Sequence, residues 1–229
     1  MMRRLCTAAA LFAAVVFAAP PPNGSPPPKD PPKDVGSPMP DFKLKPVVKG
    51  KAPENPYSKK EIARGEYLVR FGSCDDCHTP KLFDPKSNAP MPEMSRRLSG
   101  HPEGAPVAFS SLAAGDSAVI GPTFTAFKTP FGESYAANLT PDMDTGTGKW
   151  TEEQFVKIFR TGKHLGNGRP IVPPMPWASL AKMSDEDLKS IFAFLRSLPP
   201  VKNAVPQVAP TDDQLKALDR VNSMMMLAP

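Results

Sequence analysis

The stretch Cys74-Asp75-Asp76-Cys77-His78 decides how the rest of this chain is interpreted. Two thiols three positions apart can both reach the vinyl groups on one side of a haem, and the histidine that follows then points at the iron as its proximal ligand. The pattern therefore predicts one covalently bound haem c, attached through Cys74 and Cys77 and ligated by His78.

Three other uses of the same residues compete with haem. A structural zinc site needs a second pair of ligands, and the only other cysteine, Cys6, lies in a segment that we expect to be removed. A thioredoxin-like dithiol opens a helix after a strand, whereas here a helix is expected to precede the motif. A plain disulfide between Cys74 and Cys77 is the simplest alternative. The context disfavours zinc and leaves the redox dithiol and the disulfide open beside haem.

Helical patterns lie on both sides of the motif. Residues 58–61 read Ser-Lys-Lys-Glu, a capping box, and the apolar residues after them keep a helical period up to Gly72. A second helix is expected over 151–162 and a third over 184–198, each opened by a capping residue and carrying an apolar stripe. A last, weak helix is expected from Thr211 to about residue 223. The sequence thus predicts an all-α fold of three short helices around the motif.

The region between residues 81 and 149 has little helical periodicity. Only 117–120 and 123–127 hint at strands, so the expected exception to the all-α class is one short β-hairpin in a long, loop-rich insertion. Three short helices and long loops make a thin core. A buried porphyrin would supply the missing apolar area.

Residues 1–18 have the pattern of a secretory signal peptide. Arg3 and Arg4 precede an apolar stretch that ends at Ala19, and the small residue Ala18 favours cleavage there. As a helix the apolar stretch spans only about 22 Å, short of the roughly 30 Å hydrocarbon core, so no stable transmembrane segment is expected. The sequence therefore predicts a periplasmic or exported protein whose signal is cleaved.

Residues 19–57 are predicted to be a disordered, proline-rich spacer. Thirteen prolines lie between Pro20 and Pro56, with almost no large apolar residue before Phe42. Such a segment cannot bury enough surface to offset its ordering entropy, so we expect no fold before about residue 57. The haem domain is expected over 58–200 and a tail over 201–229.

Composition and charge exclude several classes of protein. The 229 residues carry a net charge of +5, and loss of the signal lowers it to about +3, too mild a balance to indicate nucleic-acid binding. Three cysteines exclude a disulfide-rich scaffold. The lack of a second long apolar run excludes a polytopic membrane protein.

A six-coordinate iron needs a second, distal ligand. Met175 lies in Val-Pro-Pro-Met-Pro-Trp at 172–177, where prolines fix the backbone and leave a thioether with no helical face to pack on. His164, in a Gly-Lys-His-Leu-Gly loop, is the next candidate, and His101 is weaker. We expect Met175 to be the distal ligand.

These features together resemble class I cytochrome c domains, and most of all those in the cytochrome subunits of bacterial alcohol and gluconate dehydrogenases. The likeness covers roughly residues 58–200. Its motifs occur in order: Arg64-Gly65-Glu66-Tyr67-Leu68, the haem motif, Thr129-Pro130-Phe131-Gly132, Asn138-Leu139-Thr140-Pro141-Asp142, Thr145-Gly146-Thr147-Gly148-Lys149-Trp150, Met175-Pro176-Trp177 and Asp185-Glu186-Asp187-Leu188.

The resemblance implies a class I three-helix haem domain with His78 and Met175 as axial ligands of the iron. Trp177, in the same motif as Met175, is expected at the cofactor, and Asn138 and Arg169 are candidates for hydrogen bonds to the haem propionates. The family's subunits carry several haem motifs whereas this chain has one, which excludes a haem-to-haem wire within it. The region from residue 81 to 129 is not accounted for.

Two functions follow as expectations. In the first, the protein is no enzyme but transfers single electrons to or from a redox partner protein on the dehydrogenase or terminal oxidase side. In the second, the sixth ligand is displaceable and the protein is a haem-based ligand sensor or a peroxidase-like enzyme. The second needs a distal polar group beside a vacant site, and no acid-base pair at a recognisable spacing is evident. The electron carrier is therefore favoured.

Overall fold

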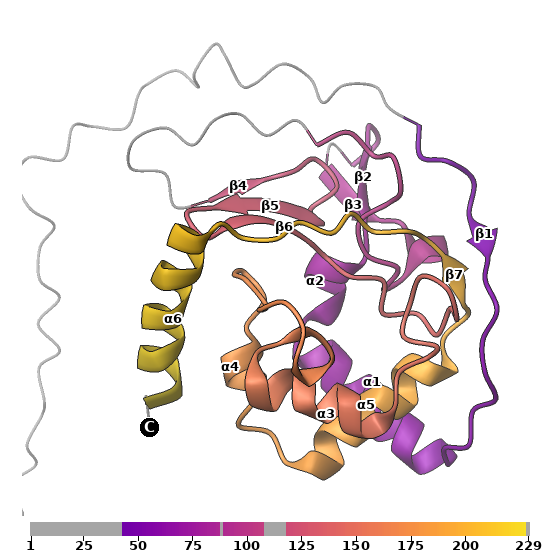
Figure 1. Cartoon of the computed structure of the whole chain (residues 1–229). Helices are drawn as coiled ribbons and strands as arrows, with labels where there is room; N and C mark the ends of the chain where they lie inside the picture. The colour runs from indigo at the N-terminus through magenta and orange to yellow at the C-terminus, as the bar shows by residue number, and fades with distance from the viewer. Residues whose placement is uncertain (1–42, 88, 108–117, 228–229) are drawn as a thin grey trace, which may run out of the picture. The chain divides into compact units, whose positions relative to one another are not determined.

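The computed structural model of this chain describes residues 43–87, 89–107 and 118–227 (Figure 1). The predicted signal peptide and the spacer up to residue 42 lie outside the described residues. The described elements belong to one compact unit, which begins at Asp41 and is described from residue 43 onward.

The three predicted helices are confirmed as α1 Lys59–Phe71, α3 Glu152–Thr161 and α5 Asp185–Ser197. Each begins at its predicted cap. The Ser58 side chain accepts from the backbone N–H of Glu61, Thr151 accepts from that of Gln154, and Ser184 from that of Asp187. These side-chain oxygens satisfy amide groups that have no partner inside the helix, which is why the starts could be located from sequence.

Helices α1 and α5 cross in close contact, and the crossing depends on Gly65. A Cβ atom on Gly65 would lie 1.8 Å from the backbone oxygen of Ser190 and 2.8 Å from the Cβ of Phe194. Around this crossing lies the apolar core, to which α3 adds buried aromatic residues. The core consists of Leu68, Val69, Leu98, Phe155, Val156, Ile158, Phe159, Trp177, Ala178, Leu188, Ile191, Phe192, Phe194 and Leu195.

The all-α prediction is wrong. The described residues form six α-helices and seven strands, and the strands make three small sheets. Besides the three core helices, the structure has the expected last helix, α6 Asp212–Leu227, and two that were not expected, α2 Cys74–His78 and α4 Trp177–Leu180. Two 3-10 turns, η1 Met94–Arg96 and η2 His164–Gly166, accompany them. Backbone groups of a loop-rich region that packs on a core need partners, and short strands supply them without an alternating sequence pattern.

Two of the three sheets come from the region that lacked helical periodicity. Strands β2 Lys81–Asp84 and β3 Ala89–Pro92 form an antiparallel hairpin. Strands β4 Val119–Ile120, β5 Ala126–Thr129 and β6 Gly132–Tyr135 form an antiparallel meander in which Phe127 pairs with Ser134. The expected hairpin is thus present, and a third strand extends it.

The spacer prediction is wrong for its described part. Strand β1 Val48–Lys49 pairs antiparallel with β7 Val201–Lys202. Beyond it, the Gly50 N–H donates to the Pro200 carbonyl at 2.9 Å and the Lys51 N–H donates to Asp142 Oδ2 at 3.0 Å. The segment is held by its backbone while the Val48 side chain is 54% exposed. A hydrophobic pattern therefore could not have revealed this pairing.

A chain that begins at Glu54 is expected to fold but to be less stable than one that begins at Asp41. It lacks β1 and the bonds of Gly50 and Lys51, and at about 1 kcal/mol for each lost hydrogen bond the cost is roughly 2–4 kcal/mol. For a domain of this size that lowers the melting temperature by about 5–12 °C. Thermal unfolding of both proteins, each with its haem, measures the difference. Equal melting temperatures would contradict the role given to β1.

The C-terminal segment belongs to the folded unit, so the predicted boundary at residue 200 is too early. Asn203 is 2% exposed, and its amide donates to the carbonyl oxygens of Ser99 and His101 at 2.6 and 2.9 Å. Helix α6 begins after the predicted cap Thr211 but ends at Leu227, four residues later than expected. Within the described parts of the chain, no helix combines the length and the apolarity that crossing a membrane requires.

Candidate functional site

A cavity of about 380 Å³ lies between the haem motif, the helices and the β4–β6 sheet. Cofactor sites usually measure roughly 300–1,000 Å³. The lining is mainly apolar and comes from every helix of the predicted core. It includes Leu68, Val69, Cys74, Cys77, His78, Phe127, Ser134, Tyr135, Ala137, Trp150, Phe155, Ile158, Phe159, His164, Arg169, Ile171, Met175, Leu180, Ile191 and Leu195.

His78 is held in one tautomer. Its ring is 8% exposed, and Nδ1 lies 2.9 Å from the carbonyl oxygen of Ala137. A carbonyl only accepts, so Nδ1 carries the proton and donates, which leaves the Nε2 lone pair free in the neutral ring. Burial lowers the pKa of His78 and so favours that neutral form. A histidine oriented by a backbone carbonyl is the usual arrangement of a metal ligand.

Cys74 and Cys77 are free thiols on the same cavity. Burial raises the pKa of Cys74 to about 11 and also raises the pKa of Cys77. A redox-active dithiol needs the opposite shift, because the thiolate is the reactive form. Among the described residues no three His, Cys, Asp or Glu side chains come together as a metal-binding group. The raised thiol pKa values thus disfavour the redox pair, and the described residues offer no zinc site.

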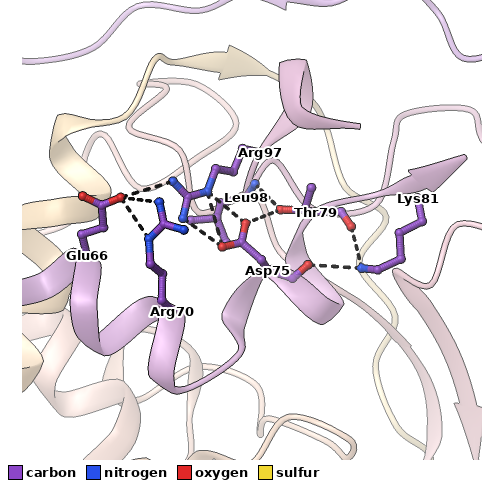
Figure 2. Close-up of polar contacts among 7 residues, drawn as sticks. All are labelled: Glu66, Arg70, Asp75, Thr79, Lys81, Arg97 and Leu98. Carbon is purple, nitrogen blue, oxygen red and sulfur yellow. Dashed lines mark hydrogen bonds and ion pairs between the residues drawn. The ribbon is translucent and has the colours of Figure 1, made fainter. Parts of the chain in front are cut away.

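The other face of α2 is held by a polar cluster (Figure 2). Arg97 Nε and Nη2 donate to the two oxygens of Asp75 at 3.1 and 3.0 Å, and Thr79 Oγ1 donates to Asp75 Oδ1 at 2.7 Å. Burial raises the pKa of Asp75, but the hydrogen bonds from Arg97 and Thr79 outweigh it and hold the pKa below its usual value. Lys81 Nζ donates to the carbonyl oxygens of Asp76 and Thr79 at 2.6 and 3.1 Å, where a helix end attracts positive charge.

The segment around residues 97–101, which the resemblance left unexplained, supports the motif. The Gly100 N–H donates to the His78 carbonyl at 2.8 Å, and the Leu98 N–H donates to Thr79 Oγ1 at 3.0 Å. Leu98 is fully buried and has a φ of +58°, an unusual backbone conformation for leucine. Sequence reasoning missed these residues and also Ala137, because nothing in a local pattern marks a contact across 20 to 60 positions.

Of the three candidate distal ligands, Met175 and His164 line the cavity and His101 does not. Met175 is half-buried and lines the cavity, and its carbonyl accepts from the Trp177 N–H at 2.9 Å at the start of α4. His164 lines the same cavity, with its ring 5.3 Å from that of Trp150. His101 is not on the lining but is 1% exposed, with Nδ1 3.0 Å from Thr125 Oγ1.

The other predicted cofactor contacts lie in different places. Arg169 lines the cavity, and its Nε and Nη2 donate to Gln207 Oε1 at 3.1 and 2.9 Å. Asn138 is 3% exposed and is not part of the cavity lining. Its side-chain amide donates instead to the Val201 carbonyl at 2.8 Å. Trp177 is buried against the end of α3, where a Cβ on Gly162 would lie 2.6 Å from its ring. Asn138 and Trp177 therefore stabilise the fold around the site.

Tyr135, Phe127 and Trp150 contribute to the lining without having been predicted to do so. Phe127 and Tyr135 lie on β5 and β6, and Trp150 lies just before α3. A signal for Phe127 existed in the strand pattern at 123–127. That pattern could not say which face of the sheet meets the cavity.

The residues of this cavity fit a covalently bound haem. Two thiols, one neutral imidazole with a free Nε2, one thioether and an apolar wall are the donor set and the surroundings that such a group needs. The site thus agrees with the expected resemblance to c-type cytochrome domains.

Comparison with known proteins confirms the expected resemblance. The chain is 33% identical over 144 residues to the gluconate 2-dehydrogenase cytochrome c subunit of Pantoea cypripedii, a match that covers 62% of this chain and 24% of the relative. It is 30% identical over 151 residues to the cytochrome c subunit of the quinone alcohol dehydrogenase of Gluconobacter oxydans (strain 621H), covering 65% and 24%. A shorter match, 37% over 70 residues, is to the fructose dehydrogenase cytochrome subunit of Gluconobacter japonicus, covering 31% and 14%.

The chain is thus homologous to cytochrome c subunits of dehydrogenases. This supports a role in electron transfer. This chain matches only about a quarter of the length of the gluconate and alcohol dehydrogenase subunits. No family model matches the chain.

Proposed function

We propose that this protein is a mono-haem c-type cytochrome that transfers single electrons through a covalent haem with His78 and Met175 as axial ligands. The observation that carries the proposal is that Cys74, Cys77, His78 and Met175 all line one apolar cavity. When bound, the haem supplies the one-electron chemistry of its iron.

Each residue of the site then has a defined task. Cys74 and Cys77 would bind the haem covalently, and the Ala137 carbonyl orients the His78 ring and leaves its Nε2 available as a ligand. Met175 would offer a soft thioether, which favours ferrous iron and so raises the reduction potential. The mainly apolar lining would limit the access of water to the bound haem.

The partner and the location follow from the relatives and from the N-terminal sequence. The relatives are named as subunits of gluconate, alcohol and fructose dehydrogenases, so we propose a dehydrogenase as the redox partner. The pattern of residues 1–18 supports export to the periplasm with cleavage of the signal. In this role the chain is an electron-transfer partner and not itself the enzyme.

A Met175→Ala variant tests the distal ligand. The ferric wild-type protein is expected to show a weak far-red band from sulfur-to-iron charge transfer, and the variant is expected to lose the band and to have a lower reduction potential. Met183→Ala is the matched control, since Met183 packs on the core and is not on the cavity lining. Absorption spectra and a potentiometric titration of the three proteins provide the measurement.

The same experiment decides between the two functions. A band that survives in Met175→Ala would assign the sulfur ligand to another methionine. No such band in the wild type, with rapid stoichiometric binding of carbon monoxide to the ferrous protein, would favour the sensor or peroxidase-like function. His164, which lines the same cavity, would then be the polar residue available to a molecule bound at the sixth position of the iron.

A further inference from the structure

The short helix that carries the haem motif has two faces with different surroundings. Cys74, Cys77 and His78 line the cavity together with Asp76, and Asp75 and Thr79 do not. Residues three and four apart share a helix face, so Cys74, Cys77 and His78 lie on the same side. A helix of five residues is too short to be stable alone. The contacts of Asp75 and Thr79 on its rear face therefore add to those of His78 with Ala137 and Gly100 in fixing its orientation.

Arg97 binds that rear face at two points. Its Nε and Nη2 donate to Asp75 Oδ1 and Oδ2, and Thr79 Oγ1 also donates to Oδ1 (Figure 2). A planar guanidinium bound to both oxygens of a carboxylate fixes direction as well as distance. A rotation of α2 about its own axis would break at least one of these bonds, and the same rotation would swing His78 away from its present direction.

Arg97 is in turn fixed by the two crossing helices. Its Cζ lies 5.4 Å from the ring centroid of Phe194 on α5, and its Nη1 lies 3.9 Å from Glu66 Oε1 on α1. The Arg97 side chain is only 18% exposed, unlike a solvated surface ion pair. Arg97 therefore connects α2 to both helices of the α1–α5 crossing.

We propose that Arg97, through Asp75, is a positioning residue that sets the orientation of α2 and with it the direction of the His78 ring toward the iron. This role rests on the proposed haem function. It concerns residues that lie behind the haem motif and are not part of the cavity lining.

A purely electrostatic role makes a different prediction. Loss of the positive charge of Arg97 alone would favour ferric iron and lower the reduction potential, whereas loss of the negative charge of Asp75 alone would raise it. In a variant that lacks both charges the two effects would largely cancel. Positioning requires instead that all three variants change alike, because each one removes the same contact.

The test compares Arg97→Gln, Asp75→Asn and the double variant as purified holoproteins. The readouts are the reduction potential and the hyperfine-shifted haem methyl resonances in proton NMR of the ferric state, which report the orientation of the axial ligands. We expect all three to share one altered resonance pattern and to shift the potential in one direction. Arg97→Lys keeps the charge but not the two-point contact, so it should show the altered pattern too.

Arg70→Gln is the matched control. Arg70 also pairs with Glu66 near the motif, but its side chain is 65% exposed and acts on Asp75 only through its charge, without a hydrogen bond to it. Its resonance pattern should match that of the wild type. Asp75→Asn preserves the size of the side chain, so with Arg97→Lys it decides the question even if Arg97→Gln does not yield holoprotein.

Two results would overturn the positioning role. Opposite shifts of potential in the single variants, with unchanged resonances, would mean that the pair acts only by charge. Unchanged potential and resonances with a lower melting temperature would mean that it only stabilises the fold. Haem that can be extracted from the wild-type protein with acid acetone would instead refute the proposed function, before any variant is compared.

Discussion

Replacing both Cys74 and Cys77 by alanine is expected to abolish covalent haem attachment and most of the folded state. The wild-type protein should retain its haem through denaturation and extraction with acid acetone, and the double variant should release all of it. Without the haem, the mainly apolar lining of the cavity is exposed to water, at a cost of about 25 cal/mol for each Å² of apolar surface. An ordinary domain has a total stability of only roughly 5–15 kcal/mol.

The two single variants are the internal control for this experiment. Cys74→Ala and Cys77→Ala each keep one thiol on the cavity, so each should retain haem through a single thioether and remain folded. Acid-acetone extraction and far-ultraviolet circular dichroism of the four proteins give the comparison. Haem that extracts freely from the wild type would refute covalent attachment and with it the proposed function.

Gly65→Ala is expected to destabilise the protein by about 3–5 kcal/mol, in the upper range of single substitutions. Helix propensity alone predicts that Gly65→Ala would stabilise the protein, because alanine is favoured over glycine inside a helix by about 1 kcal/mol. The structure reverses the sign because the added Cβ would lie 1.8 Å from the Ser190 carbonyl oxygen, a backbone atom that cannot turn away. Helices α1 and α5 would have to separate.

The control is Ala63→Gly on the exposed side of the same helix. It should cost about 1 kcal/mol, which measures the propensity of this helix without the crossing. Denaturant unfolding of the holoproteins followed by circular dichroism gives both values. A Gly65→Ala protein as stable as the wild type, or more stable, would contradict the close approach of α1 and α5.

Several features of the site could be predicted because their signals are local. The capping residues Ser58, Thr151 and Ser184 satisfy amide groups two or three positions away, so the helix starts were visible in the sequence. The spacing of Cys74, Cys77 and His78 is likewise a property of one helical turn. Met175 was identified from the prolines that flank it, and the structure places it on the cavity lining.

The haem motif, the three core helices and the candidate ligands could be predicted from local sequence, since each depends on residues within about four positions of one another. Their surroundings, in contrast, depend on how distant parts of the chain fold together. The pairing of β1 with β7, the Arg97 contact to Asp75 and the Ala137 carbonyl at His78 join residues 22 to 154 positions apart. Backbone pairing and long-range hydrogen bonds depend on where the chain returns in space, which leaves no periodic trace in the residues that make them.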